Sequence, residues 1–337
     1  MLEQLSTTAE TVEKVVSPNP LFDHRTPLAT VASEKARTAV KRAMGERVDG
    51  IKEELCGLDL IEMEIVFSAK DEVCTCWFDY KDRPSFTPAL LSDISKVQES
   101  LRAWHEKSEI GESKLKYLVW ASRMPGVWNL GGDLSLFADL IRKQDDAKLR
   151  EYAYRVVREG YANWTNLNLP ITTVALVQGD ALGGGFEAAL SSNLIVAERS
   201  AKFGLPEILF SLFPGMGAYS FLSRRITPSQ AQRMIMSGRL YGAEELYELG
   251  IVDVLADDGR GVETFHQYVA KNERRHTAHR AIFQARQRIN PVTLKEMMDI
   301  TDLWVDTAMS LEETDLKKMA RLVSAQDRRR TRVLQSA

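Results

Sequence analysis

Two glutamates, Glu187 and Glu207, have surroundings that could give a carboxyl group a chemical role. Glu187 lies between Phe186 and two alanines, and Glu207 follows Pro206 and precedes an Ile-Leu-Phe run. Apolar neighbours disfavour the ionised form of a carboxyl group and raise its pKa toward the range that suits acid–base catalysis. The pair therefore predicts proton transfer. The alternative is that Glu187 complements a helix dipole and Glu207 caps the next helix.

Three consecutive glycines, Gly183, Gly184 and Gly185, precede this first glutamate. They separate the apolar residues 171–177 from an alanine-rich segment, which is the pattern of a strand that turns into a helix. Glycine permits a positive φ and the close approach of other groups. We expect the helix to begin near Gly185, so that its free N–H groups could hold an anion or a developing oxyanion.

A second glycine turn occurs at residues 129–133, which read Asn-Leu-Gly-Gly-Asp. Gly131 and Gly132 allow a tightly turned, exposed backbone, and Asp133 can cap a helix that begins there. A capped surface turn explains this segment equally well without further evidence.

Strands and helices that could position these turns are predicted on both sides of them. Two apolar runs, at residues 58–67 and 73–80, predict a β-hairpin. Thr87 and Pro88 suit the start of an amphipathic helix. The other predicted elements are strands at 115–121, 171–177 and 251–255 and helices at 149–164, 218–225, 228–236 and 243–249.

The composition is that of an ordinary globular protein, with 44 % hydrophobic and 27 % charged residues among 337. A net charge of −3 gives no general signal for nucleic acid or an anionic membrane. The three cysteines, Cys56, Cys74 and Cys76, lack the spacing of a zinc site and favour a reducing, cytoplasmic location. We expect neither a secretion signal nor a membrane-inserted segment.

Three regions are predicted from these patterns. Residues 1–45 have scattered apolar positions and are expected to form a mobile N-terminal extension. Residues 46–258 alternate strands and helices and predict an α/β catalytic core. Residues 259–337 are helical and strongly charged, and we expect them to form a C-terminal domain that acts as a lid or in oligomerisation.

Histidine and arginine clusters offer two weaker candidates. His276 and His279 are three residues apart on a predicted helix, so they could bind a metal, but a solvated helix face explains them better because no carboxylate or cysteine accompanies them. The basic segments 271–288 and 328–332 could steer an acidic substrate carrier, but solvated helix surfaces are again the simpler explanation.

The order of the motifs resembles the crotonase (enoyl-CoA hydratase/isomerase) superfamily. The chain contains G-D-A-L-G-G-G-F-E, then F-G-L-P-E, then P-G-M-G, and the two glutamates fall where this superfamily has its two hydratase glutamates. The resemblance covers about residues 58–258. It implies the crotonase fold, an α/β spiral of ββα units, here followed by an α-helical C-terminal region. It also implies a thioester substrate and no metal or other cofactor.

Several runs resemble one branch of the superfamily, the RpfF-type diffusible signal factor (DSF) synthases. These runs include NLGGDLSLF, AERSAKFGLPEILF and AHRAIFQAR, and they extend the resemblance to about residue 330. The branch implies a cis-2-unsaturated fatty acid signal, made from 3-hydroxyacyl-acyl carrier protein by dehydration and thioester hydrolysis. The alternatives are a trans-2-enoyl-CoA hydratase of fatty-acid breakdown and a crotonase-scaffold protein that binds a sensor kinase.

The resemblance also implies roles for individual residues. Glu207 would be the base and Glu187 the acid. The backbone N–H groups of Leu130 and Gly184 would form the oxyanion hole, supported by Gly131, Gly132, Gly183 and Gly185. Met216, Trp304 and Leu322 would line the acyl pocket. Implied partners are acyl carrier protein or CoA thioesters, the receiver domain of a sensor kinase, and further copies of the chain in a homotrimer or hexamer.

Overall fold

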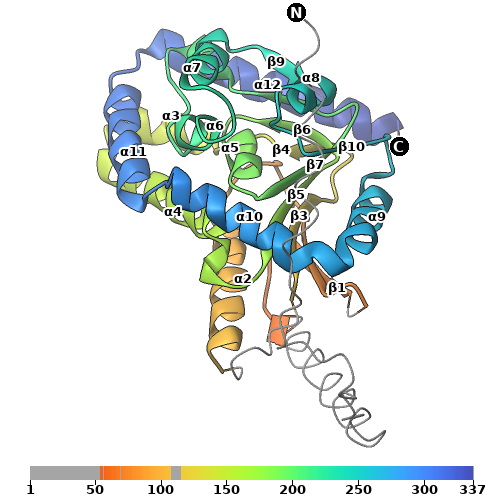
Figure 1. The fold of residues 1–337 in the computed structure, drawn as a ribbon. Helices are drawn as coiled ribbons and strands as arrows, with labels where there is room; N and C mark the ends of the chain where they lie inside the picture. Colours follow the sequence, from red (N-terminus) through yellow and green to blue (C-terminus); the bar gives the residue numbers. More distant parts are fainter. Residues whose placement is uncertain (1–53, 56, 69, 108–114, 337) are drawn as a thin grey trace, which may run out of the picture. The chain divides into compact units, whose positions relative to one another are not determined.

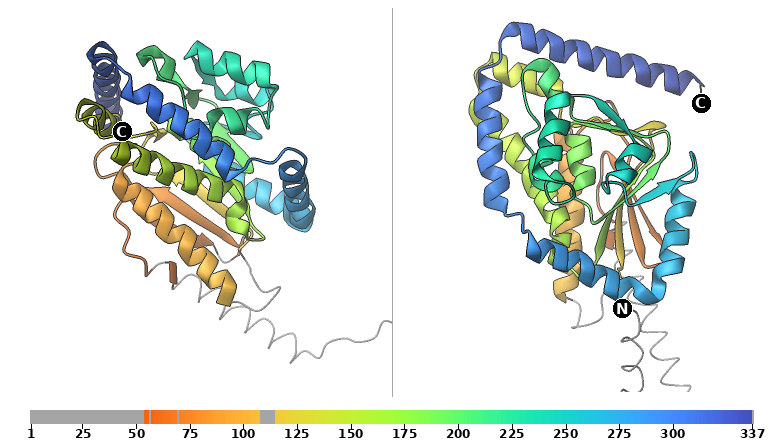
Figure 2. Two further views of the ribbon diagram at one scale, coloured as in Figure 1. Left: turned by 90° about the vertical axis from the view of Figure 1, so that its left-hand side faces the viewer. Right: turned by 45° about the horizontal axis from the view of Figure 1, so that its top comes forward.

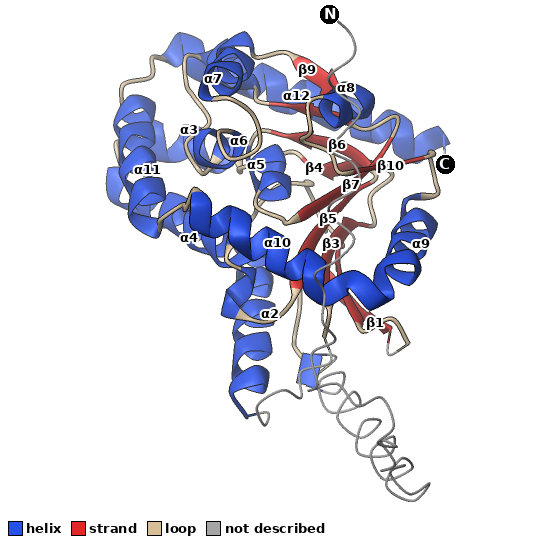
Figure 3. Ribbon diagram, in the orientation of Figure 1, coloured by secondary structure: helices blue, strands red, loops and turns tan. Residues whose placement is uncertain are grey.

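The computed structural model describes residues 54–55, 57–68, 70–107 and 115–336, with side chains described as far as residue 324. The predicted N-terminal extension, residues 1–45, and the side chains of the basic segment 328–332 lie outside this description. The described residues belong to one compact unit. Figure 1 shows the order of the elements within it, and Figure 3 separates helices from strands.

The described strands form a six-stranded and a four-stranded sheet. The first sheet has the order β1 (Met63–Ser68), β2 (Val73–Phe78), β3 (Tyr117–Ser122), β5 (Thr172–Val177), β7 (Leu194–Glu198) and β10 (Val254–Ala256). The β1–β2 pair is antiparallel, and the strands from β2 onward are parallel. The predicted hairpin is therefore confirmed, with a first strand that is shorter than expected.

The second sheet consists of β4 (Gly126–Asn129), β6 (Gly179–Leu182), β8 (Lys202–Gly204) and β9 (Leu240–Gly242). Three strands of the first sheet continue within a few residues into this one: β3 into β4, β5 into β6, and β7 into β8. A helical segment follows each pair, so the chain repeats a ββα unit. The α/β fold that the crotonase resemblance implies is confirmed.

Helices cover both faces of the first sheet. On one face Val119, Val174 and Val196 contact Phe265 and Val269 of α9 (Gly261–Asn272). The opposite face packs toward α2 (Pro88–Lys107) and α4 (Asp146–Trp164). Burial on both faces explains why β3, β5 and β7 read as continuous apolar runs instead of alternating patterns.

Several helix starts follow the predicted capping chemistry. The Asp133 carboxylate accepts hydrogen bonds from the N–H groups of Ser135 and Leu136 at the start of α3 (Leu134–Arg142). Thr227 forms a capping box with Gln230 before α7 (Pro228–Ser237). The shorter helical elements are η1 (Asn166–Asn168), α5 (Gly184–Leu190), η2 (Pro206–Phe210), α6 (Ala218–Leu222), α8 (Ala243–Glu248) and η3 (Glu273–Arg275).

The C-terminal helices fold back over the core. They are α10 (His276–Ile289), α11 (Leu294–Met309) and α12 (Glu313–Ser336). Helix α11 packs along α4, which in turn packs on α2, and α12 contacts α3 and η2. The left view of Figure 2 shows α11, α4 and α2 side by side.

His276 does not lie on a solvated helix face, so that prediction is wrong. Its side chain is buried, its Nε2 lies 3.2 Å from the Lys116 carbonyl oxygen, and its ring packs against that of Tyr117. Burial lowers the pKa of His276 to about 4 and keeps the ring neutral. The histidine joins the start of α10 to the strand β3 beneath it.

Candidate active site

Glu187 is held at the start of a short helix. Strand β6 ends at Leu182, and Gly183 makes the turn into α5 with φ +53° and ψ −127°, a conformation that side chains strongly disfavour. Glu187 is only 4 % exposed. Its Oε1 accepts hydrogen bonds of 2.9 Å from the N–H groups of Met216 and Ala218, which precede and begin α6.

Glu207 reaches the same place from the neighbouring strand. Strand β8 pairs in parallel with β6, and the Gly183 N–H donates to the Gly204 carbonyl at 2.8 Å. A Cβ atom on Gly183 would lie 2.7 Å from Glu207 Oε1, so glycine leaves the room that this carboxylate occupies. Although Glu207 as a whole is half-buried, its Oε2 is inaccessible and has no hydrogen-bond partner among the described residues.

The environment raises the pKa of both carboxyl groups. Burial is the main cause for each: it raises the pKa of Glu187 to about 7, against two N–H donors that favour its ionised form. The pKa of Glu207 is raised to about 8, by burial and then by the negative charge of Glu187. Near neutral pH the pair therefore holds a proton that it can donate, while keeping a site that can accept one.

Two loops meet at glycines beside these carboxylates. A Cβ atom on Gly131, whose φ is +92°, would lie 2.7 Å from the Gly184 nitrogen, and a Cβ atom on Gly185 would lie 2.1 Å from the Asn129 carbonyl oxygen. A side chain at these positions would push the two loops apart. Gly184 is the first residue of α5, so its N–H has no acceptor within the helix. The structure thus brings the two predicted glycine turns together.

The Leu130 N–H, the other predicted oxyanion donor, is already engaged in this structure. It donates to the Pro84 carbonyl oxygen at 2.7 Å, and the Phe86 N–H donates to the Gly131 carbonyl, also at 2.7 Å. Residues 84–86 thus run alongside the loop like a short parallel strand. A substrate oxygen can use Leu130 only by replacing the Pro84 carbonyl.

A buried polar network, absent from the sequence prediction, supports the same loop. Asn129 is fully buried; its Oδ1 accepts from the Gly131 N–H at 2.7 Å, and its Nδ2 donates to Tyr80 Oη at 3.0 Å. Tyr80 in turn donates to the Trp128 carbonyl at 2.5 Å. The sequence could have indicated this network through the asparagine within the glycine turn, but its partner Tyr80 is 49 residues away in the sequence.

The predicted acyl-pocket residues Met216, Trp304 and Leu322 all line one cavity with both glutamates; we call it the outer cavity. Leu130, Gly132, Gly183 and Gly184 also border it. Glycine at position 215 allows the Trp304 side chain to approach closely, because an added Cβ atom would lie 2.3 Å from the tryptophan Cβ. Thr301 Oγ1 donates to the Gly215 carbonyl at 2.9 Å and fixes α11 against this turn.

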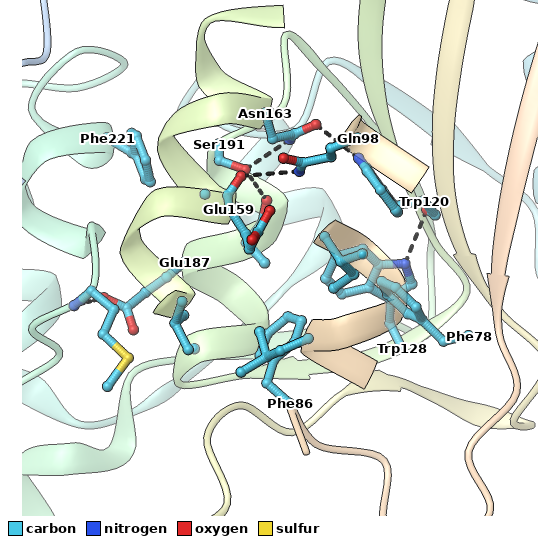
Figure 4. Close-up of a pocket in the computed structure, with 17 residues that line it drawn as sticks. Phe78, Phe86, Gln98, Trp120, Trp128, Glu159, Asn163, Glu187, Ser191 and Phe221 are labelled. Atoms are coloured by element: carbon cyan, nitrogen blue, oxygen red, sulfur yellow. Dashed lines mark hydrogen bonds between the residues drawn. The ribbon is translucent and has the colours of Figure 1, made fainter. Parts of the chain in front are cut away.

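A second cavity also borders Glu187; we call it the inner cavity. It shares Gly184, Glu187 and Met216 with the outer cavity and extends between α2, α4 and α5. Figure 4 shows aromatic side chains on one side of it and a group of polar side chains at one end. The sequence prediction did not include this cavity, because its walls come from helices far apart in the chain.

Across the described residues, no group of three or more His, Cys, Asp or Glu side chains is placed to hold a metal ion. In the same part of the chain, no helix is both long and apolar enough to cross a membrane.

A sequence profile of the family described as enoyl-CoA hydratase/isomerase matches residues 91–300, which is more than half of the chain. The ββα repeats, the two glycine turns and the paired glutamates already define a protein of the crotonase type. The chain belongs to the enoyl-CoA hydratase/isomerase family.

The chain is similar in sequence to several curated hydratases. Human mitochondrial methylglutaconyl-CoA hydratase is 30 % identical over 168 residues, which cover 50 % of this chain and 45 % of that protein. The probable mitochondrial enoyl-CoA hydratase 2 of Arabidopsis thaliana is 27 % identical over 255 residues, which cover 73 % of this chain and 74 % of that protein. The chain thus spans about half the length of the methylglutaconyl-CoA hydratases that it matches.

Solved structures share the fold. Pseudomonas aeruginosa DspI superposes with a TM-score of 0.59 at 24 % identity, covering 73 % of this chain and 97 % of that one. The enoyl-CoA hydratase of Bacillus halodurans superposes with a TM-score of 0.63 at 21 % identity, covering 78 % of this chain and 100 % of that one. Together with the family match, these likenesses establish the crotonase fold.

Proposed function

We propose that the chain dehydrates 3-hydroxyacyl thioesters and is a synthase of the DSF family. In this proposal it converts 3-hydroxyacyl-acyl carrier protein to the cis-2-enoyl thioester and then hydrolyses the thioester to a free cis-2-unsaturated fatty acid. One observation carries the proposal: Glu187 and Glu207 border the same cavity beside the free start of α5. Family membership supports the thioester chemistry, and the motif resemblance supports the finer assignment.

The dehydration needs one base, one acid and a site for negative charge. The thioester oxygen would lie against the Gly184 N–H, joined by the Leu130 N–H once the substrate replaces the Pro84 carbonyl. The two carboxyl groups share one proton near neutral pH; in the arrangement that reacts Glu187 carries it, although the higher pKa of Glu207 makes this the less populated arrangement. Ionised Glu207 then takes a proton from C2. Protonated Glu187 gives its proton to the 3-hydroxyl group. The C3–O bond then breaks, water leaves, and the C2–C3 double bond forms.

Hydrolysis of the thioester can use the same groups. One carboxylate takes a proton from water while the water oxygen bonds to the carbonyl carbon, and the oxyanion site again stabilises the negative oxygen. The C–S bond then breaks, and the proton passes to the departing thiolate. No added oxidant or reductant is required.

A second candidate is a trans-2-enoyl-CoA hydratase, which would run the first step in the opposite direction. The names of the curated relatives favour it, since they are hydratases of CoA thioesters. We also propose that the substrate is a CoA or acyl carrier protein thioester, that no further cofactor takes part, and that the protein is cytoplasmic. We propose further that it forms a homotrimer or hexamer with α9–α12 as lid or interface, and that a sensor-kinase receiver domain is a partner.

Product analysis separates the two candidates. The purified protein would be given 3-hydroxydodecanoyl-acyl carrier protein in one reaction and crotonyl-CoA in another, with products identified by mass spectrometry. Release of free cis-2-dodecenoic acid, lost in a Glu187→Ala/Glu207→Ala variant, is the result expected for a DSF synthase. Rapid hydration of crotonyl-CoA without release of free acid would support the hydratase instead. Activity on neither substrate would contradict both.

A further inference from the structure

The inner cavity continues the catalytic chamber and has no part in the roles assigned so far. Gly184, Glu187 and Met216 border both cavities, so a substrate that reacts at Glu187 can extend into either one. The outer cavity holds both glutamates and therefore the reacting carbons. The inner cavity is lined by Glu187 but not by Glu207, so it lies next to the reacting carbons and does not enclose them.

Three helices each present one face to the inner cavity. Residues at helical spacing line it: Leu91, Ile94 and Gln98 from α2, Val156, Glu159, Gly160 and Asn163 from α4, and Gly184, Glu187, Ala188 and Ser191 from α5. From Gly184 to Ser191 the α5 face extends for about 10 Å at 1.5 Å per residue. The cavity thus has the form of a channel that runs along α5, away from the reacting carbons.

The channel is apolar over most of its length and polar at one end. Phe86, Trp128 and Phe221 are buried along its wall. In Figure 4 the side chains of Gln98, Glu159, Asn163 and Ser191 gather together, away from Phe86. The space open to the centre of a water-sized sphere is about 50 Å³, room for only a few waters, since each needs about 10–15 Å³. A small apolar space of this kind suits a short stretch of alkyl chain.

The polar end has unused hydrogen-bonding capacity. Asn163 is satisfied, since it accepts from Trp120 Nε1 at 2.8 Å and donates to Ser191 Oγ at 2.8 Å. Gln98 donates to the Glu159 carbonyl at 3.2 Å, but its buried Oε1 has no partner among the described residues. These polar side chains close the channel, so a terminal methyl group that reached them would meet polar atoms instead of an apolar wall. The polar end therefore opposes chains that are long enough to reach it.

Gly160 leaves the channel wall open. It lies inside α4, where glycine is less favourable than alanine. A Cβ atom added there would meet no described atom within 4 Å, and its φ is not positive. Neither a turn nor a close approach of another segment requires this glycine. Its one visible effect is to keep space free beside the channel.

We propose that the inner cavity receives the distal part of an unbranched acyl chain, with its polar end at Gln98 and Glu159 limiting the chain length. The chain passes Glu187 and Met216, while the thioester and its carrier arm stay in the outer cavity. This inference rests on the proposed action on acyl thioesters. It differs from the acyl pocket implied by the resemblance, because Trp304 and Leu322 then surround the reacting end rather than the tail.

Two matched variants test which cavity holds the tail. Gly160→Leu fills the inner cavity, and Leu322→Trp fills the outer one. Relative kcat/KM would be measured with 3-hydroxyacyl thioesters from four to fourteen carbons. For Gly160→Leu we expect a loss of about tenfold or more with the longest chains that the wild type uses, and an unchanged value with the four-carbon substrate. A profile that matches the wild type, or a loss of long-chain activity in Leu322→Trp alone, would overturn the inference.

A third variant and two controls complete the test. Gln98→Ala shortens a side chain that closes the channel, so relative kcat/KM should rise for chains longer than the wild-type limit; no rise would contradict the role of the polar end. Melting temperatures of Gly160→Leu and Gly160→Ala check folding. Calorimetric binding of free 3-hydroxy acids gives a length profile without turnover. Wild-type protein that is inactive on every chain length refutes the proposed function, whereas an unshifted profile refutes only this inference.

Discussion

The segments that carry Glu187 and Glu207 are built alike. Each leaves the end of a short parallel strand, β6 or β8, and places its glutamate within the first turns of a helical element. The carboxylates differ in their partners: Glu187 Oε1 accepts two backbone N–H bonds, whereas Glu207 Oε2 has no partner within the described chain. Two neighbouring carboxylates thus differ: backbone hydrogen bonds fix Glu187, whereas Glu207 Oε2 has no such partner among the described residues.

The largest expected effect separates the two roles. Glu207→Gln and Glu187→Gln should each lower the dehydration rate by about 10²–10⁴-fold, the usual contribution of an acid or a base. Only Glu207→Gln should also abolish exchange of the C2 protons of a saturated acyl thioester in D2O, because that exchange needs the base but no leaving hydroxyl. NMR measures the exchange. Loss of exchange in Glu187→Gln, with retention in Glu207→Gln, would reverse the assignment.

The next effect concerns the glycine between the two segments. Gly183→Ala introduces a Cβ atom 2.7 Å from Glu207 Oε1 at a residue with φ +53°, while the Glu187 bonds to Met216 and Ala218 are not touched directly. We expect kcat/KM to fall by about 10²-fold through misplacement of Glu207, with about 1–3 kcal/mol lost in the free energy of unfolding. Gly160→Ala is the matched control. Equal activities and denaturation midpoints for both variants would contradict this prediction.

The smallest effect is on stability. Burial raises the pKa of Glu207, so the folded state retains a proton that the unfolded chain releases above about pH 4.5. The free energy of unfolding therefore falls as the pH rises from there toward about 8. Glu207→Gln should therefore melt about 2 °C or more above the wild type at pH 9 and equally at pH 5. Glu187→Gln should gain less, since two N–H groups already stabilise its ionised form.

The control for this measurement is the exposed Glu151. Glu151→Gln should leave the melting temperature unchanged at both pH values. A Glu207→Gln protein that melts no higher than the wild type at pH 9 would show that the ionised carboxylate is not destabilising, and would remove the difference between the two glutamates.

Local sequence determined much of this protein. Helix starts can be predicted at Asp133 and at Thr227–Pro228. The Asp133 and Thr227 side chains accept hydrogen bonds from free N–H groups of the first turn, and the Pro228 ring fixes a helical φ. The glycine run before Glu187 predicts a strand-to-helix turn, and the motif order predicts the family. The strands of the second sheet were missed because segments of three or four residues, several containing glycine, carry no readable period.

Tertiary structure alone decided how these parts work together. The partners of Glu187 are 29 and 31 residues away, and the Leu130 N–H meets a carbonyl from a distant turn. His276 is buried at the start of α10, a helix that looks solvated by its composition, and the inner cavity exists only where α2, α4 and α5 meet. Periodicity records which face of an element is buried, but not which distant residue will satisfy a buried polar atom there. Tertiary packing determines that partner.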